Sequence, residues 1–379
     1  MGNSDSLLRE IATRERSPDF RFAGMVLPNP DQVLRLQGKS IQTYRDMRID
    51  GHVGGCIRRR KSAVKALESG LDDRQAPARV VQSVRDMLRD LPMDRLIGNA
   101  LDAVLYGYQP MEVTWKTVGR LWAPGDVVAK PPEWFGFDSE NRLRFKTRED
   151  QVQGELLPDR KFLLPRQDAT YDNPYGFADL SMCYWPIVFK KGGMKFWLRF
   201  VEKFGGTFMI GKLPRTATKQ EHDELLDSLD RLIQDGVGTI PDDGSVAPLE
   251  SDSKKASADL YERLVMFCRS EVSIALTGTN QTTEADSNLA SATAGLTVAE
   301  SIRDGDASLV AAELNKLIRW IVDLNWGGGP APLFKFWDQE ARDVLQAARD
   351  SSNHSAGARF TNAYWRRAYG YQAGDLHDG

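Results

Sequence analysis

Few residues of this sequence have the types and the spacing that catalysis requires. The string Gly206-Thr-Phe-Met-Ile-Gly-Lys212 has the glycine spacing and the lysine of a phosphate-binding P-loop. Leu213 follows where such a loop needs a Ser or Thr to hold Mg²⁺, and the middle of the string is an apolar, strand-like run. An NTPase is therefore disfavoured.

Metal-ligating residues are equally dispersed. No two of the four histidines stand four residues apart, and only one of them lies near a cysteine, Cys56. The paired acid Asp242-Asp243 precedes a glycine, which is more typical of a solvated turn than of a metal site. We predict no metal, no cofactor and no catalytic residue. The histidines are His52, His222, His354 and His377.

The composition is that of an ordinary globular protein with two or three domains. The 379 residues are 41% hydrophobic and 27% charged, with a mean hydropathy of -0.44. No apolar run is long enough to span a bilayer, so we expect no membrane partner. The three cysteines are too few and too far apart for a disulfide framework, and we expect them to be reduced core residues.

Charge is unevenly distributed along a chain whose net charge is only -3. Residues 186–215 contain seven Lys or Arg and one acid, whereas residues 221–262 contain twelve acids and three bases. The low net charge argues against a surface that grips nucleic acid tightly. Adjacent segments of opposite sign predict complementary subunit surfaces or a channel with banded potential, and two solvated faces of one monomer are the alternative.

Periodicity predicts helices joined by short strands. Apolar spacing indicates helices near 41–49, 56–67, 77–91, 94–105, 219–234 and 256–276. Alanine-rich helices are expected after the polar loop 277–288, to about residue 324. Residues 121–166 contain several short strands and form an expected small β insertion. Strands are also expected at 111–115, 207–210, 237–240, 245–249 and 333–336, and the loop 277–288 is polar.

The expected helix of about 177–204 carries two patterns. Its aromatic string indicates core or interhelix packing, and Gly192-Gly193 should weaken or bend it. A basic stripe repeats every four residues beside the aromatics. The aromatics are Trp185, Phe189, Phe196, Trp197 and Phe200, and the stripe is Lys191, Lys195, Arg199 and Lys203.

Nine strings, in order from residue 50 to 326, resemble the Mu-like family of tailed-phage portal proteins. The first is Asp50-Gly-His-Val-Gly-Gly-Cys-Ile-Arg-Arg-Arg-Lys-Ser-Ala-Val-Lys-Ala-Leu67. Glu68-Ser-Gly70 departs from the family, in which an aromatic is common at this place. The other strings are 101–115, Pro132–Asp138, Asn173–Gly176, Trp197–Gly205, Ile210–Lys212, Leu276–Thr283, Ile302–Ala307 and Leu324–Trp326.

The resemblance implies a mainly helical α+β portal fold and a ring of twelve subunits at one capsid vertex. Each subunit would have wing, stem, clip and crown regions around a channel. Double-stranded DNA would pass through this channel without recognition of its sequence. The implied partners are other copies of the chain, the major capsid protein, the terminase large subunit and a head-tail adaptor. The implied location is the virion, after assembly in the host cytoplasm. Relatives often continue beyond the last strand, so a full crown is not expected here.

The family's regions map onto this sequence as follows. Residues 1–40 would be an extended arm, 41–93 the first part of the wing, 94–120 the first stem helix and lead-in, and 121–170 the clip. Residues 171–205 would be the second stem helix, 206–288 the second part of the wing with the tunnel helix and loop, and 289–379 the helical region next to the crown.

Three groups of residues are candidate sites on this mapping. The polar loop after the helix of 256–276 would be a tunnel loop, or an ordinary helix connection. The basic stripe would face the channel, or pair with acids of 221–262 in a neighbouring subunit. The clip would carry the docking residues. These are Thr277, Thr279, Asn280, Gln281, Thr282, Thr283, Glu284 and Asp286 in the loop, and Glu133, Trp134, Phe135, Arg142 and Arg144 in the clip.

Two other classes of function remain open from the sequence. One is a metal-dependent DNA-processing enzyme, such as a nuclease or nucleotidyltransferase, whose carboxylates are dispersed. The other is a different head-tail structural or adaptor protein. The mass of the particle separates the classes, because a dozen 42.5 kDa chains would approach half a megadalton.

Overall fold

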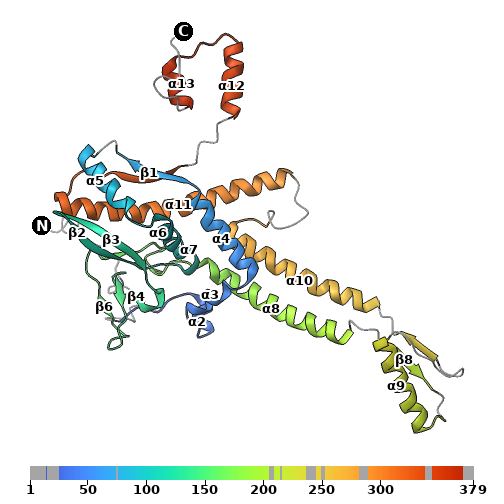
Figure 1. Ribbon diagram of the computed structural model, residues 1–379. Coiled ribbons are helices and arrows are strands. Elements are labelled where there is room, and N and C mark those ends of the chain that lie inside the picture. Colours follow the sequence, from blue (N-terminus) through green and yellow to red (C-terminus); the bar gives the residue numbers. More distant parts are fainter. Residues whose placement is uncertain are drawn as a thin grey trace.

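The chain folds into a body of packed helices and small sheets from which an arm of two long helices projects (Figure 1). The computed structural model describes residue 14 and residues 25–73, 76–204, 209–213, 216–235, 245–248, 252–280, 289–337 and 344–369. The predicted α+β class with a majority of helix is confirmed. No helix in these described ranges is both long enough and apolar enough to cross a membrane.

One hydrophobic core lies around helix α11, whose second half is buried on several sides. Val310, Leu314, Leu317 and Ile321 of α11 are fully or almost fully buried against two helices and two sheets. Residues 121–163 therefore share this core with residues 64–101. The elements are α11 (Leu289–Trp326), α5 (Ala78–Arg89), α6 (Met93–Ala100), sheet β3-β2-β7 (Leu121–Ala129, Met111–Val118, Phe162–Leu163) and sheet β1-β10 (Glu68–Asp72, Leu333–Trp337).

A second core joins the N-terminal helices to the root of the arm. Tyr44, Val53, Tyr108, Phe137 and Leu180 are buried in it, and Tyr108 and Phe137 pack edge to face with their centroids 5.6 Å apart. Its elements are α2 (Gln32–Leu36), α3 (Gln42–Met47), α4 (Gly51–Lys65), α7 (Asp102–Tyr106), the short helix η2 (Pro132–Trp134) and sheet β4-β5-β6 (Phe135–Phe137, Leu143–Phe145, Glu155–Leu156).

The departure from the family at Glu68-Ser-Gly70 has a local explanation. This segment forms β1, which pairs antiparallel with β10, and Glu68 accepts a 2.8 Å hydrogen bond from the Trp337 indole. The Trp337 ring covers Gly70 so closely that a Cβ there would lie 2.7 Å from it. An aromatic on β10 therefore occupies the space next to β1.

The arm consists of α8 (Asp179–Phe204) and α10 (Asp252–Thr277), which lie side by side (Figure 1). α8 is continuous through Gly192-Gly193, the predicted weak point, and Leu264 of α10 lies so close to Gly193 that a Cβ there would be 2.9 Å from it. Beyond the arm the chain forms a tip. The tip contains α9 (Lys219–Asp235) and the antiparallel pair β8 (Met209–Lys212) and β9 (Ser245–Pro248).

The described part of the P-loop-like string Gly206–Lys212 lies in the tip. Met209–Lys212 is a strand paired to β9, as its apolar run predicted, and not a phosphate-cradling loop. Residues 205–208 and the expected strand 237–240 lie outside the described residues, as does Asp242-Asp243.

The last described segment is a helical hairpin, residues 344–369, called the C-terminal hairpin below. It consists of α12 (Val344–Ser355) and α13 (Asn362–Tyr369). Gly357, with φ near +99°, allows the reversal between the two helices.

Candidate functional site

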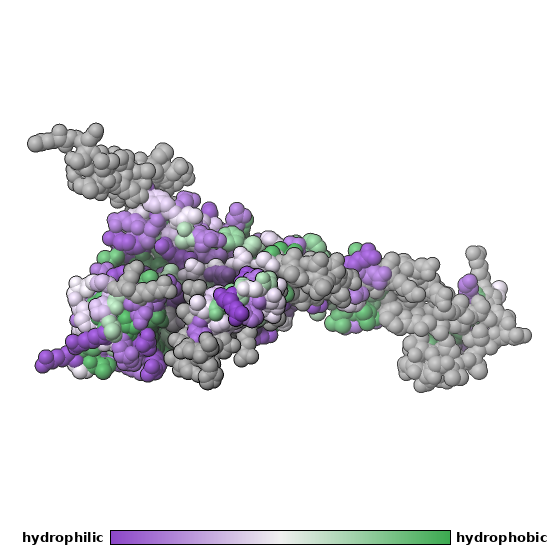
Figure 2. Space-filling view, turned by 90° about the horizontal axis from the view of Figure 1, so that it is seen from above, coloured by the Kyte–Doolittle hydropathy of each residue, from purple (hydrophilic) through white to green (hydrophobic). Residues whose placement is uncertain are grey.

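The arm exposes many large apolar side chains. Figure 2 shows hydrophobic residues at its surface beside charged ones. On α8, Trp185, Phe189 and Phe196 are 47%, 54% and 59% exposed, and on α10 Phe267 is 63% exposed. Their predicted assignment to core or interhelix packing is therefore wrong for Trp185, Phe189 and Phe196. Clusters of large exposed apolar side chains mark interaction surfaces.

Helical phase sorts these side chains into two opposite faces of the arm. Gly193 meets Leu264, and the Phe200 ring lies 6.0 Å from Tyr261, which fixes how the two helices face each other. We call the two faces the aromatic face and the aliphatic face. The aromatic face is Trp185, Phe189, Phe196, Leu260, Phe267 and Ile274, and the aliphatic face is Met194, Leu198 and Val201.

The basic stripe lies between these two faces, on the side of α8 that points away from α10. Two residues of offset rotate a helix position by roughly 200°, so Lys191, Lys195 and Arg199 stand opposite Gly193 and Trp197. All three basic side chains are exposed, and no ion pair joins them to a described residue. The side chain of Lys203 lies outside the described ones.

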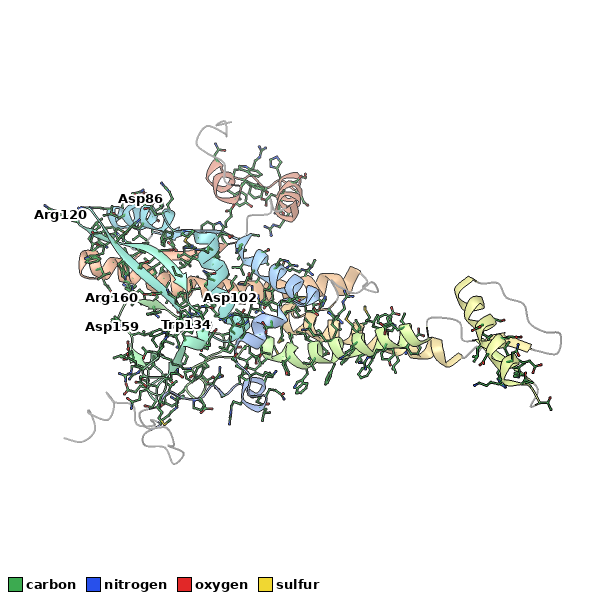
Figure 3. All side chains as sticks on the ribbon, turned by 60° about the horizontal axis from the view of Figure 1, so that its bottom comes forward. Asp86, Asp102, Arg120, Trp134, Asp159 and Arg160 are labelled. Atoms are coloured by element: carbon green, nitrogen blue, oxygen red, sulfur yellow. The ribbon has the colours of Figure 1, made fainter. Side chains whose placement is uncertain are left out.

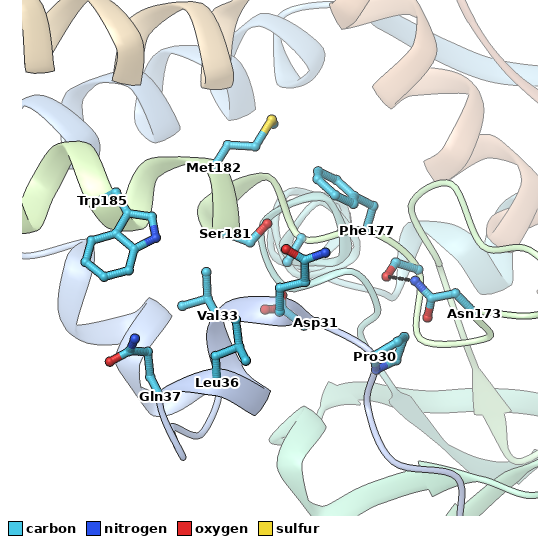
Figure 4. Close-up of a pocket in the computed structure, with 13 residues that line it drawn as sticks. Pro30, Asp31, Val33, Leu36, Gln37, Asn173, Phe177, Ser181, Met182 and Trp185 are labelled. Carbon is cyan, nitrogen blue, oxygen red and sulfur yellow. Dashed lines mark hydrogen bonds between the residues drawn. The ribbon is translucent and has the colours of Figure 1, made fainter.

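A hollow opens at the root of the arm, between α2 and the first turns of α8 (Figure 4). Its volume is about 530 Å³. Leu36, Phe177, Met182 and Trp185 line it and are all partly exposed to solvent. Because Trp185 belongs to both, the hollow continues the aromatic face onto the body.

Arg60 anchors both roots of the arm to the body. Its guanidinium donates two hydrogen bonds to Asp306 of α11, 2.7 and 2.9 Å long, and one of 2.6 Å to Asp179 at the start of α8. A fourth, 3.1 Å long, reaches the carbonyl oxygen of Leu276 at the end of α10. One side chain of α4 therefore holds three other helices together.

The anchor is buried, and burial governs its charges. The side chains of Arg60 and Asp179 are 10% exposed, and that of Asp306 is 4% exposed. Burial opposes the charge of Arg60, but the two carboxylates outweigh it and raise its pKa. Burial raises the pKa of Asp179 to about 6, although Arg60 acts in the opposite direction.

A second buried contact fixes α8 against the start of α4. Lys190 donates to both carboxylate oxygens of Asp50, at 2.9 and 2.8 Å, while Asp50 also caps α4 by accepting from the backbone of His52 and Val53. Burial opposes the charge of Asp50, yet Lys190 and the amides lower its pKa. This contact sets the roll of α8 at its root.

The histidine that the sequence singled out beside Cys56 is a packing contact at the same place. Nε2 of His52 lies 3.0 Å from the carbonyl oxygen of Arg269 and 2.8 Å from Oγ of Ser273, which is fully buried. Burial lowers the pKa of His52. Across the described ranges, no three His, Cys, Asp or Glu side chains are grouped so that they could hold a metal ion.

Comparison with protein families gives this arrangement a context. A family model described as the portal protein of Mu bacteriophage matches residues 41–371. The match runs from the start of α3 to the end of the C-terminal hairpin and includes the anchor and the whole arm. The chain belongs to this portal protein family. The members of this family are structural phage components and not enzymes.

Two curated relatives match most of the chain. The portal protein of Escherichia phage Mu is 26% identical over 328 residues, which are 82% of this chain and 62% of that protein. The Mu-like prophage FluMu protein gp29 of Haemophilus influenzae is 24% identical over 324 residues, 80% of this chain and 61% of that protein. The chain therefore spans about three fifths of the length of the curated relatives it matches.

Solved structures share the fold at low sequence identity. A chain in the neck of an empty gene transfer agent particle has a TM-score of 0.59 at 12% identity, with 90% of this chain and 98% of that chain covered. A chain in the virion of a native gene transfer agent particle has a TM-score of 0.57 at 13% identity, with 88% and 93% covered. With the family match, these likenesses confirm the predicted portal fold.

The predicted portal clip residues lie in the body of the molecule and not at the tip. Glu133 binds Arg45 of α3 through two contacts of 2.5 and 2.7 Å, and Phe135 is 1% exposed in the second core. Arg142 and Arg144 both bind Asp138. Trp134, labelled in Figure 3, is 49% exposed and is the one exposed large apolar side chain among the five.

Only three of the eight tunnel-loop candidates, Thr277, Thr279 and Asn280, belong to the described residues. The Thr277 hydroxyl bonds to the backbone of Ser273 and Thr279, Thr279 is 8% exposed, and Asn280 donates a 2.7 Å hydrogen bond to Ser270. These three therefore pack against the end of α10 and do not project from it. The remaining candidates, Gln281, Thr282, Thr283, Glu284 and Asp286, lie outside the described residues, and a channel role for this loop stays a prediction.

The predicted pairing of stem helices requires a correction. Residues 93–106 form two short helices, α6 and α7, whose apolar residues are buried all round in the body. The long partner of α8 is α10, and the segment between these two helices is the tip rather than residues 121–170. A helix that is apolar on every side belongs in a core, and this burial explains why 94–105 cannot serve as part of an exposed arm.

Proposed function

We propose that this chain forms a ring that serves as a passage for double-stranded DNA at one vertex of a tailed-phage capsid. The observation that carries the proposal is the arm, which has two apolar faces on opposite sides and is anchored at both roots by Arg60. Two different complementary faces produce head-to-tail contacts, and such contacts close into a ring when the rotation between copies allows it.

In the proposed ring, the aromatic face of one arm packs against the aliphatic face of the next. Phe267, Phe196 and Leu198 would exchange exposures of 63%, 59% and 60% for burial between neighbours. The hollow beside Trp185 extends this contact to the body. The anchor supports closure, because each subunit must present its arm at the same angle.

The basic stripe then has a defined direction. With both apolar faces covered by neighbours, the side of α8 that carries Lys191, Lys195 and Arg199 faces either the axis or the outside of the ring. We assign it to the axis, where rings of exposed cations steady DNA through phosphate contacts that salt weakens. Because the chain as a whole is slightly acidic, these contacts do not add up to tight binding of DNA.

The regions of the family take new positions in this proposal. The arm helices α8 and α10 correspond to the stem, and the tip with β8, α9 and β9 corresponds to the clip. The exposed acids Glu221, Asp223, Glu224 and Asp227 of α9 make the tip a docking surface for basic patches of the terminase large subunit and then of a head-tail adaptor. The body would contact the major capsid protein.

The ring itself is tested by native mass spectrometry of the purified chain together with electron microscopy. A closed assembly near half a megadalton, the mass of a dozen 42.5 kDa chains, is the expected result. Images should show an axial opening wide enough for duplex DNA. Isolated globules, or closed assemblies with no axial hole, would contradict the proposal.

Replacing Lys195 and Arg199 together by Gln should leave ring assembly intact and reduce DNA packaging. Both side chains are exposed on the side of α8 that neither apolar face uses, so their charges contribute to the channel and not to closure. The measurements are the native mass of the variant and the DNA content of heads made when it complements a portal-deficient phage.

A matched control is Arg85→Gln with Arg89→Gln, an exposed pair at the same spacing on α5, which should package normally. Failure of the Lys195 and Arg199 variant to assemble would place the stripe at the subunit interface instead. In that case its partners are acids of residues 221–262 in the neighbouring copy.

A further inference from the structure

The C-terminal hairpin is held together by a small polar and aromatic cluster of its own. Asp350, 2% exposed, accepts hydrogen bonds from the hydroxyls of Tyr364 and Tyr369, 2.7 and 2.8 Å long. The rings of Phe360 and Tyr364 stack with centroids 4.6 Å apart, and Trp365 packs on Tyr369 at 5.1 Å. The aromatic side chains are therefore engaged with one another.

The hairpin has the opposite charge to the rest of the chain. Its 26 residues hold four arginines and one acid, a net charge of +3 in a chain whose total is -3. The single acid is Asp350, which is enclosed by the tyrosine hydroxyls. Arg349 and Arg359 are exposed, and neither forms an ion pair with any residue in the described part of the chain.

We propose that the C-terminal hairpin binds the phosphate backbone of double-stranded DNA without sequence preference. Arginine presents a planar fork of donors that matches phosphate oxygens, and the hairpin contains four arginines and no lysine. Since its aromatic rings stack on one another, they are not offered to unpaired bases. Backbone contacts of this kind fix position and carry no sequence information.

An acidic protein surface is a less suitable partner for this hairpin. The centre of a protein interface is depleted of charge and enriched in exposed apolar side chains, whereas nucleic-acid interfaces are polar and strongly positive. No described side chain of residues 351–369 is a largely exposed aromatic or large aliphatic residue, and the arginines are spread over α12, the connection and α13. This distribution fits a repeating line of phosphates.

The proposed binding belongs to a single subunit and does not depend on a ring. If copies assemble, several hairpins act on one duplex, and their combined affinity exceeds that of each hairpin. The ring and the hairpin can therefore fail separately, because mass reports the first and DNA affinity reports the second.

The test uses the full-length chain and a short fluorescein-labelled DNA duplex, with fluorescence anisotropy measured over a series of salt concentrations. The test variant replaces Arg349, Arg359, Arg366 and Arg367 by Gln. Each lost phosphate contact lowers the slope of log affinity against log salt by about 1, so we expect the wild-type slope to fall by about 3 to 4. Affinity at low salt should fall with it.

The matched control replaces four exposed arginines of the body, Arg35, Arg79, Arg85 and Arg89, by Gln, with the same change in net charge. It should keep the wild-type slope. Ser352→Arg adds a charge at an exposed position of α12 without removing any contact and should steepen the slope by about 1. Native mass spectra of the same samples record whether assembly has changed.

An unchanged affinity and slope in the hairpin variant would overturn the proposal and favour an acidic protein partner. Equal losses in the hairpin and body variants would also overturn it, because they would show an effect of total charge. A Ser352→Arg variant that binds no more tightly than the wild type would count against it in the same way, even if the four-arginine variant folded poorly.

Discussion

The Phe267→Glu variant is expected to stay a folded monomer under conditions in which the wild-type chain assembles. Phe267 is 63% exposed on the aromatic face of the arm, so the free subunit loses nothing when it is replaced. In the assembled ring of subunits, the change removes the burial of the Phe267 side chain, which is worth about 1.5–3 kcal/mol at each interface. It also places a carboxylate where water is excluded. We expect each contact to weaken at least tenfold, which is the effect of ~1.4 kcal/mol.

Native mass spectrometry measures the assembly, and thermal unfolding shows that the subunit is intact. Val118→Glu is the matched control, because Val118 is 54% exposed at the end of β2, on the body and not on the arm, and it should assemble normally. Rings formed by Phe267→Glu at the wild-type concentration would exclude the aromatic face from the interface.

A mixing experiment then examines which face meets which. Leu198→Glu alters the aliphatic face and should also give monomers, since Leu198 is 60% exposed there. Each of the two variants keeps one intact face, so a mixture retains one good interface per pair and should form heterodimers but no ring. A mixture that contains only monomers would show that the two faces do not contact each other.

The sequence predicted the arm only in part, and the reason is physical. Periodicity predicts the helix of about 177–204 and its basic stripe, and α8 occupies 179–204. Its aromatics were assigned to packing because a single chain gives no sign of which apolar face a neighbour covers. The partner helix was misplaced because α10 has apolar residues on several sides, and its contact with α8 depends on Gly193 and Leu264, which are 71 residues apart.

The anchor could not be read from any local pattern. Arg58-Arg-Arg-Lys61 showed a crowded turn of charge, and the strings Ile302–Ala307 and Asp50–Leu67 were recognised for their resemblance alone. The structure distinguishes these arginines, because Arg60 is buried among four helices whereas Arg58 is exposed. Its partners Asp179 and Asp306 come from elements more than a hundred residues away, a pairing that periodicity does not encode.

Removing the anchor should destabilise the fold more than any surface change. In Arg60→Met the carboxylates of Asp179 and Asp306 remain buried without their cation, and a broken buried ion pair costs about 3–5 kcal/mol. Urea unfolding followed by tryptophan fluorescence measures this loss. Arg58→Met is the control, since Arg58 is exposed and forms no ion pair with a buried acid of the described residues. Its free energy of unfolding should change by no more than about 0.5 kcal/mol. Equal stability of the two variants would refute the anchor.

The two acids of the anchor should respond differently to substitution. Asp306 receives two hydrogen bonds from Arg60, so Asp306→Asn should lose roughly 3 kcal/mol by leaving the guanidinium undercompensated. Asp179 receives one, and burial raises its pKa from 3.8 to about 6. Its carboxylate is thus held at a cost, and Asp179→Asn, which keeps an acceptor for Arg60, should lose much less at neutral pH.

The pH dependence of Asp179→Asn isolates that cost. A raised pKa in the folded state means that the stability contributed by Asp179 is complete below pH 3.8 and is lost as the pH rises through about 6. Asn does not ionise, so the variant should gain stability relative to the wild type across this interval. Urea unfolding of both proteins at a series of pH values measures the difference. A difference that stays constant would mean that Asp179 ionises in the folded state as readily as in the unfolded chain, and that Arg60 compensates both acids fully.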